Sequence, residues 1–163
     1  MNASMNKSSY PLPAHSSGFT LIELMVTVVV LAIITTIAAP NISSQLANQR
    51  VKSTTATLSN ALKEAKVESI IRRQKVTLSY DNTSDLRFIT TTGSDGSVIA
   101  NYSYTSQSTI RPLSVTTIIF EPSKRVTTAR TFTICDNNMT VSPRQIMVSA
   151  IAVITSRLGG TCP

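Results

Sequence analysis

The hydrophobic positions of this chain are concentrated in one early stretch. Residues 19–39 are almost entirely apolar, and Glu23 is the single charged residue among these 21 positions. At 1.5 Å rise per residue, a helix of this length spans about 32 Å, close to the roughly 30 Å hydrocarbon core of a bilayer. The pattern therefore predicts one helix that crosses a membrane.

Glu23 is the exception within this apolar segment. An ionised carboxylate inside a bilayer costs about 2.5 kcal/mol or more and needs a partner. The carboxylate either lies at the headgroup level, where it costs little, or pairs with a cation in a protein assembly. The residues alone leave both interpretations open.

After the apolar segment the pattern becomes amphipathic. Glycine is absent between Gly18 and Gly93, and a single proline, Pro40, lies between residues 13 and 112. One long helix is therefore predicted, interrupted or kinked at Pro40, because proline lacks a backbone donor and its ring clashes with the preceding turn. Apolar residues recur at spacings of three, four and seven, as on a buried helix face; they are Val51, Leu58, Ala61, Leu62 and Ala65. We expect the helix to end near residues 72–75, where basic side chains suit the negative end of the helix dipole.

From Lys75 onward, short stretches rich in β-branched and aromatic residues alternate with turn residues, which predicts strands. The expected strands are 76–80, 86–91, 98–104, 115–120, 131–135 and 145–155, the last one bent or paired as two. About 90 residues are marginal for an independent sheet domain, so the helix must lend its apolar face to the core. The expected fold class is α+β, with a long N-terminal helix packed on a small antiparallel β-sheet.

Composition adds a basic balance to this picture. The 163 residues include 15 Lys and Arg against 8 Asp and Glu, for a formal charge of +7. Charged residues make up 14% and hydrophobic residues 42% of the chain, whereas soluble domains contain roughly 25% charged residues. The chain is therefore not a disordered polyelectrolyte.

The sequence offers little for catalysis or metal binding. Its one histidine is His15, and two cysteines are too few for a zinc site built from thiolates alone. Glu64 and Glu68 lie one helical turn apart, but lysines flank them as on a solvated face. A nucleotide-type glycine-rich loop before a helix is also missing. We expect no enzymatic activity, no metal site and no cofactor.

The N-terminal motif resembles a known processing signal. Residues 18–24 read Gly-Phe-Thr-Leu-Ile-Glu-Leu, and an apolar run and Pro40 follow them. This arrangement is similar to the class III signal of type IV pilins and type II secretion pseudopilins. The resemblance implies that a prepilin peptidase cleaves between Gly18 and Phe19, that Phe19 is N-methylated, and that Glu23 and Pro40 serve filament assembly. In this family the acid neutralises the N-terminal amine of a neighbouring subunit, which supplies the cation that Glu23 requires.

The same resemblance divides the chain into four parts. Residues 1–18 form a cleaved leader, which carries His15 and Lys7 and leaves a mature charge of +6. Residues 19–39 form the transmembrane and filament-core helix, residues 40–74 its amphipathic half, and residues 75–163 the β-sheet domain. The implied location is the inner membrane, crossed once with the sheet domain in the periplasm, and then the type IV pilus at the cell surface.

The second half of the chain resembles one branch of the pilin superfamily. Residues 117–125 read Thr-Ile-Ile-Phe-Glu-Pro-Ser-Lys-Arg, and two further apolar stretches start at Thr131 and Arg144. This order is similar to FimT/FimU-type minor pilins and to the H-type pseudopilin. It implies a minor pilin that initiates and assembles pili in a tip complex with other minor pilins and the major pilin. The pili would support motility, adhesion or DNA uptake.

A C-terminal disulfide follows from this placement. A domain outside the inner membrane lies in an oxidising compartment, which favours a bond between Cys135 and Cys162. The bond would close a loop of about 28 residues and contribute roughly 3 to 4 kcal/mol. Many pilins pin their last segment in the same way. Two buried free thiols are the alternative.

Two further functions remain open. The basic residues Lys124, Arg125, Arg144 and Arg157 are candidates for DNA binding in natural transformation, although they also fit a scattered basic surface. The Gly-Arg-x-Arg motif that contributes to DNA uptake in FimT proteins is absent, and Arg157 is the nearest basic residue. The other alternative is an H-type pseudopilin of type II secretion.

Overall fold

The structure is a computed structural model, and it describes residues 18–162 except Val115, with the side chains of residues 38–41 also outside the description. The chain divides into two compact units whose boundary falls between Ala39 and Pro40. Helix α1 (Leu21–Ile71) contributes to both units. Because its second half carries one face of buried residues and its first half does not, we describe the two units separately.

In the first unit, α1 has no side chain buried from Leu21 to Ile37. Among the described residues, no single helix combines the length and apolar character needed to cross a membrane. The helical segments Leu21–Ile37 and Ile42–Ile71 meet the requirement of length and composition only as a pair.

In the second unit, α1 buries one face. All five apolar positions expected on this face are buried, which confirms the predicted helical period. The helix ends at Ile71, just before the expected range of 72–75. Arg73 adopts a positive φ of 53°, a left-handed conformation that stops a helix.

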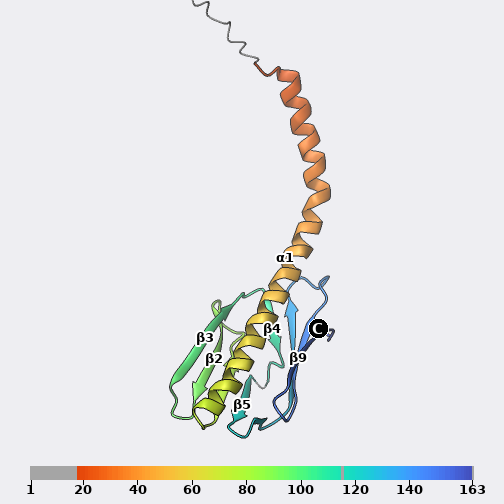
Figure 1. Cartoon of the computed structure of the whole chain (residues 1–163). Coiled ribbons are helices and arrows are strands. Elements are labelled where there is room, and N and C mark those ends of the chain that lie inside the picture. Colours follow the sequence, from red (N-terminus) through yellow and green to blue (C-terminus); the bar gives the residue numbers. More distant parts are fainter. Residues whose placement is uncertain (1–17, 115, 163) are drawn as a thin grey trace, which may run out of the picture. The chain divides into compact units, whose positions relative to one another are not determined.

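Nine antiparallel strands follow the helix in the described part of the chain (Figure 1). Their bounds are β1 (Val76–Tyr80), β2 (Arg87–Gly93), β3 (Val98–Tyr104), β4 (Ser108–Arg111), β5 (Thr117–Glu121), β6 (Arg125–Val126), β7 (Arg130–Asp136), β8 (Arg144–Val148) and β9 (Ile154–Leu158). They form a five-stranded sheet in the order β3-β2-β1-β5-β6 and a four-stranded sheet in the order β4-β7-β8-β9. The expected α+β class with a long N-terminal helix and antiparallel strands is confirmed.

Two details differ from the expectation, and one open alternative is decided. The strands form two sheets instead of one, because the chain leaves the first sheet after β3 to form β4 and returns for β5. Strands β4 and β6 were not expected, since β4 has one strongly apolar residue, Ile110, and β6 has only two residues. For the stretch 145–155, the alternative of two paired strands is confirmed by β8 and β9, because the chain turns back at residues 149–153.

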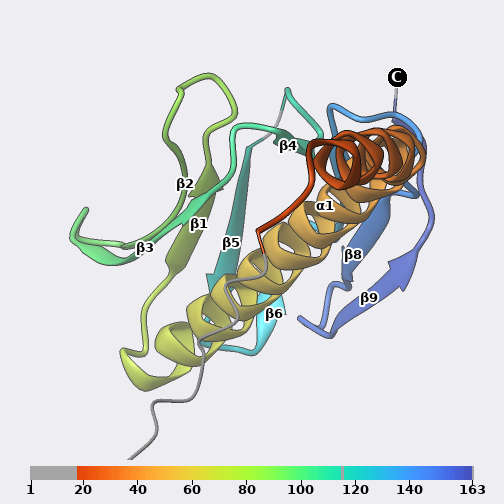
Figure 2. The same ribbon diagram turned by 90° about the horizontal axis from the view of Figure 1, so that it is seen from above.

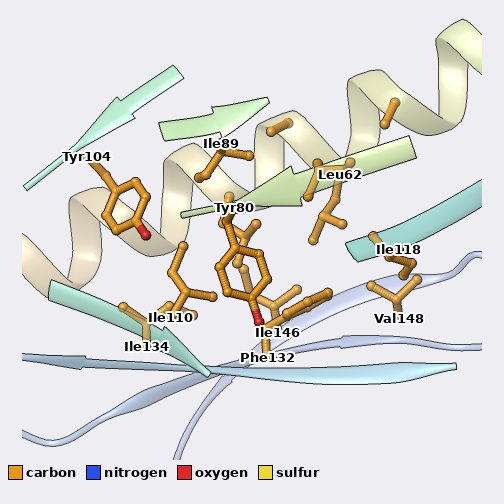
Figure 3. Close-up of a cluster of buried hydrophobic side chains, with 14 of the residues drawn as sticks. Leu62, Tyr80, Ile89, Tyr104, Ile110, Ile118, Phe132, Ile134, Ile146 and Val148 are labelled. Atoms are coloured by element: carbon orange, nitrogen blue, oxygen red, sulfur yellow. The ribbon is translucent and has the colours of Figure 1, made fainter. Parts of the chain in front are cut away.

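The second half of α1 lies over the boundary between the two sheets. In Figure 2, strands β1, β2, β3 and β5 lie on one side of the helix and β8 and β9 on the other. The core side chains therefore come from the helix and from both sheets. Figure 3 shows one example of each, with Leu62 from α1, Ile89 from the first sheet and Phe132 from the second. The rings of Tyr80 and Phe132 meet edge to face at 5.9 Å, which joins the two sheets directly.

Candidate functional site

The N-terminal motif forms the start of helix α1. The backbone N–H of Glu23 donates to Oγ1 of Thr20 at 3.2 Å, and the N–H of Leu24 donates to the Thr20 carbonyl at 3.2 Å. Thr20 and Glu23 have the T-x-x-E spacing of a capping box, in which an acid in the first helical turn also suits the positive end of the helix dipole. Sequence reasoning missed this role, although the spacing alone is a recognised signal.

The two residues at the predicted cleavage point lie before the helix. Phe19 is 80% exposed, and Gly18 has open space around it. Neither residue has regular secondary structure. The described geometry therefore leaves the bond between them accessible to a peptidase, while cleavage and methylation remain predictions.

Beyond the first turn, the side-chain hydroxyls in the exposed segment of α1 have hydrogen-bond partners within the helix. The hydroxyls of Thr27, Thr35 and Thr36 donate to backbone carbonyls three or four residues earlier, at 2.7 to 3.2 Å. Such internal pairing allows threonine to lie in an apolar environment. Glu23 is the one ionisable side chain between Gly18 and Ile37, and it has no ion pair within the described residues. This segment therefore suits burial beside apolar partners that bring a cation.

Pro40, the second expected assembly residue, is helical in its backbone. Its side chain lies outside the description, so its role in assembly stays a prediction. The leader residues 1–17, with Lys7 and His15, also lie outside the described residues.

Cys135 and Cys162 form a disulfide with their Cα atoms 5.9 Å apart. The bond holds residues 159–162, here called the C-terminal strap, on the four-stranded sheet. The N–H of Gly159 donates to the Pro143 carbonyl at 3.0 Å. Gly160 has a φ of 109°, and a Cβ there would lie 2.7 Å from Cγ2 of Thr133. The close approach of the strap to the sheet therefore requires glycine at this position.

The four candidate DNA-binding residues do not form one cluster. Lys124 and Arg125 are exposed at the turn between β5 and β6 of the five-stranded sheet. Arg144 and Arg157 lie on β8 and β9 of the other sheet, where Arg144 pairs with Leu158 and Arg157 with Gln145. Because successive residues of a strand alternate between faces, Arg144 and Arg157 point to opposite faces. Arg157 donates two hydrogen bonds to Oε1 of Gln145, at 3.0 and 3.1 Å.

The groups with shifted pKa values serve the fold. Burial raises the pKa of Tyr80 to about 12, and its hydroxyl donates to the Pro112 carbonyl at 2.5 Å. Burial also raises the pKa of Tyr104, which donates to the Asp81 carbonyl at 2.7 Å. Hydrogen bonds from Ser84 and Thr83 lower the pKa of Asp81 to about 2. Within the residues that the structure describes, no three His, Cys, Asp or Glu side chains gather as metal ligands do.

Comparisons with protein-family models give two matches. Residues 13–39 match the prokaryotic N-terminal methylation motif, and residues 54–152, more than half of the chain, match the family described as type II transport protein GspH. Among curated proteins, no significant match is found.

Two crystal structures share the fold, and a third is similar with a lower TM-score. The type IV minor pilin FimU of Pseudomonas aeruginosa is 21% identical, with a TM-score of 0.56 over 71% of this chain and 96% of FimU. A second crystal form of FimU is 22% identical, with a TM-score of 0.55 over 69% of this chain and 99% of FimU. The minor pseudopilin EpsH of Vibrio cholerae is 13% identical, with a TM-score of 0.49 over 67% of this chain and 95% of EpsH.

These matches agree with the order of features along the chain. The methylation motif covers the capped start and the exposed apolar part of α1, and the GspH match covers the buried face of α1 and most of the strands. The resemblance identified from the residues is confirmed. The chain belongs to the GspH family of type IV minor pilins and pseudopilins, and it carries their N-terminal methylation motif.

Proposed function

We propose that this protein is a minor pilin that helps to initiate and assemble type IV pili in a tip complex with other minor pilins and the major pilin. The observation that carries the proposal is the segment Leu21–Ile37, which is helical, exposed on all sides, mostly apolar and uncharged except for one acid in its first turn. A helix that is apolar all round needs apolar partners. Helices of neighbouring subunits provide such partners, and the pili would support motility, adhesion or DNA uptake.

The proposed sequence of events starts at the inner membrane. Residues 19–39 cross the membrane once, with the sheet domain in the periplasm, and a prepilin peptidase cleaves between Gly18 and Phe19. The N-methylated amine of Phe19 then forms the new terminus. As the subunit enters the pilus, its helix packs against other pilin helices, and Glu23 pairs with the terminal amine of a neighbour, which removes the cost of an unpaired buried carboxylate.

Substitution of Glu23 tests this function. In the organism that encodes the protein, Glu23→Ala should leave the sheet domain folded and the protein in the membrane, but the variant should be absent from sheared pili. Glu64→Ala, an acid in the second half of the same helix, is the matched control and should be incorporated. Immunoblots of membrane and pilus fractions measure both. Normal incorporation of the Glu23→Ala variant would rule out this role for Glu23.

An H-type pseudopilin of type II secretion is a second candidate, which the GspH family match favours. The two candidates use the same helix and differ in their partner subunits. Deletion of the gene separates them, because loss of surface pili with normal secretion supports the pilus function. Loss of secreted enzymes with normal pili supports the pseudopilus function.

DNA binding during natural transformation is a third candidate. It is favoured by the neighbouring Lys124 and Arg125, which are exposed and form no ion pair within the described residues. Binding through phosphates should appear in a gel-shift experiment at about 50 mM salt and weaken as salt increases. Charge reversal at Lys124 and Arg125 should abolish the shift, and absence of any shift would remove this candidate.

A further inference from the structure

One face of the four-stranded sheet points away from the core. Ile110, Phe132, Ile134, Ile146 and Val148 point inward and are buried. The alternate residues form what we call the outer face. Strand pairing places Arg111, Thr133, Gln145 and Arg157 side by side in one row across this face. The row starts and ends on edge strands, because β4 and β9 are the outermost strands of the sheet.

This row contains two guanidinium groups and no carboxylate. Arg157 donates to Oε1 of Gln145, and Nε2 of Gln145 donates to Oγ1 of Thr133 at 3.3 Å. Arg111 has no ion pair among the described residues, and its Nε is buried without a hydrogen-bond partner. The outer-face positions of all four strands include no Asp or Glu. The outer face therefore carries positive charge without an acid of its own, and Asp81, which lines a neighbouring groove together with Arg111, forms no ion pair with it.

A groove of about 640 Å³ lies at Arg111. Its lining includes the hydroxyl-bearing Thr131 and Thr133 of β7, Leu113 after β4, and Thr161 and Cys162 of the C-terminal strap. Leu113 is 53% exposed and so presents an apolar surface at the edge of the groove. The lining therefore consists mainly of groups that can form hydrogen bonds, with Leu113 as an apolar edge. The disulfide holds the strap in place, so the groove exists in the oxidised protein.

The chemistry of this groove favours an acidic peptide segment. A guanidinium pairs most strongly with a carboxylate in a two-pronged arrangement, and Leu113 offers an apolar contact beside it. A nucleic-acid site needs several free cations along the phosphate backbone. Here the lining of the groove includes one cation, Arg111, and the other arginine of the row, Arg157, lies outside that lining.

We propose that this groove binds an extended acidic segment of a neighbouring pilus or pseudopilus subunit, with Arg111 pairing with a carboxylate and Leu113 covering an adjacent apolar side chain. The inference rests on the proposed function for the source of the segment. Recognition of the segment itself is a property of the groove and is tested without assembly.

The test uses the full chain in mild detergent and a fluorescent peptide of alternating valine and glutamate, with fluorescence polarisation as the readout. The glutamate peptide should bind, and the same peptide with glutamine should bind about tenfold more weakly or worse, as expected for a lost charged hydrogen bond. Arg111→Gln should weaken binding of the glutamate peptide by a similar factor. Arg125→Gln, an exposed arginine on the other sheet, is the matched control and should bind as the unaltered protein does.

Two more variants keep the test decisive if Arg111→Gln unfolds, which circular dichroism would show. Leu113→Ser changes an exposed side chain and should weaken binding several-fold. Joint Cys135→Ser and Cys162→Ser substitution releases the strap and should weaken binding as well. Equal binding of the glutamate and glutamine peptides would overturn the proposal, as would unchanged binding by the Arg111→Gln or Leu113→Ser variants.

A duplex DNA of about 30 base pairs is the competing probe. If it binds more tightly than the glutamate peptide and loses its affinity in the Arg111→Gln variant, the groove is a phosphate site and the peptide proposal is wrong. All these measurements use isolated protein. They can therefore contradict the groove proposal even if Glu23 proves essential for incorporation into pili. The reverse result, with peptide binding retained and pilus incorporation independent of Glu23, would contradict the proposed function alone.

Discussion

The carboxylate of Asp136 is buried and forms an ion pair with an arginine of helix α1. Its two oxygens accept hydrogen bonds from Nε and Nη2 of Arg50, both at 2.9 Å, and Oδ1 also accepts from the N–H of Asn138 at 3.0 Å. The side chain of Asp136 is fully buried, while that of Arg50 is 24% exposed. This pair fastens helix α1 to the end of β7.

The same contacts determine how Asp136 titrates. Burial by itself raises the pKa of Asp136, but the hydrogen bonds from Arg50 and Asn138 and the charge of Arg50 outweigh it, so the pKa is lowered overall. A lowered pKa in the folded state stabilises the protein above the unfolded value of about 3.9. This contribution is lost as the pH falls through the folded pKa, below about pH 4.

We therefore predict that Asp136→Asn lowers the free energy of unfolding by about 2 kcal/mol at pH 7, because it leaves Arg50 without its anion. The loss should shrink when the pH falls below about 4, since the unaltered protein then also loses the charge. Urea unfolding at a series of pH values, followed by circular dichroism, measures both. Asp85→Asn, an exposed acid in the β1–β2 loop, should have little effect. An Asp136→Asn loss that does not depend on pH would show that packing, not charge, is responsible.

The contacts of single residues differ in how well the sequence predicts them. The capping pair Thr20 and Glu23 was readable from its spacing, because both partners lie in one helical turn. Arg50 and Asp136 are 86 positions apart, and only the packing of α1 on the four-stranded sheet brings them together. The row from Arg111 to Arg157 depends on strand register in the same way.

At the scale of elements, local periodicity was a reliable guide where an element buries one regular face. The core face of α1 follows a helical period, and β1 and β3 begin and end at the expected residues. Strand β4 has only four residues, one of them strongly apolar, and is held by its pairing with β7 and by burial of Ile110. Tertiary contacts thus stabilise β4, and no local sequence pattern predicts it.

Leu62 is a fully buried residue on the core face of α1 (Figure 3). We predict that Leu62→Ala lowers the free energy of unfolding by about 3 kcal/mol, because it removes a fully buried side chain and leaves a cavity. Val67 lies on the same helix but is 49% exposed, so Val67→Ala should change the free energy by no more than about 0.5 kcal/mol. Urea unfolding in mild detergent measures the free energy of unfolding of both variants. Equal losses would mean that α1 does not pack on the sheets through this face.

At the scale of the whole molecule, the core belongs to the second unit alone. Every buried hydrophobic residue of the described chain lies between Ala47 and Ala152. The division of the strands into two sheets was not predictable from sequence, because strand patterns do not say which strands pair. The helix that covers the boundary between the sheets then completes one shared core.

A shortened chain tests this independence. We predict that a chain beginning at Pro40 folds, stays soluble without detergent and unfolds in urea with a free energy equal to that of the full chain, within the roughly 10 to 15% uncertainty of extrapolation. The reason is that the removed segment contributes no buried side chain among its described residues. Gel filtration and urea unfolding check this. Aggregation or a clearly lower stability would show that residues before Pro40 support the core.

The position of the C-terminal strap also determines where an epitope tag can be attached to the protein. Because Cys162 is tied to Cys135 on β7, an inner strand, anything attached after it leaves from the outer face and crowds the groove at Arg111. A C-terminal epitope tag would therefore disturb the surface that it is meant to report on. The β2–β3 turn belongs to the other sheet, and Gly96 there has open space around it. An inserted tag at this turn would leave both the groove and the N-terminal processing motif untouched.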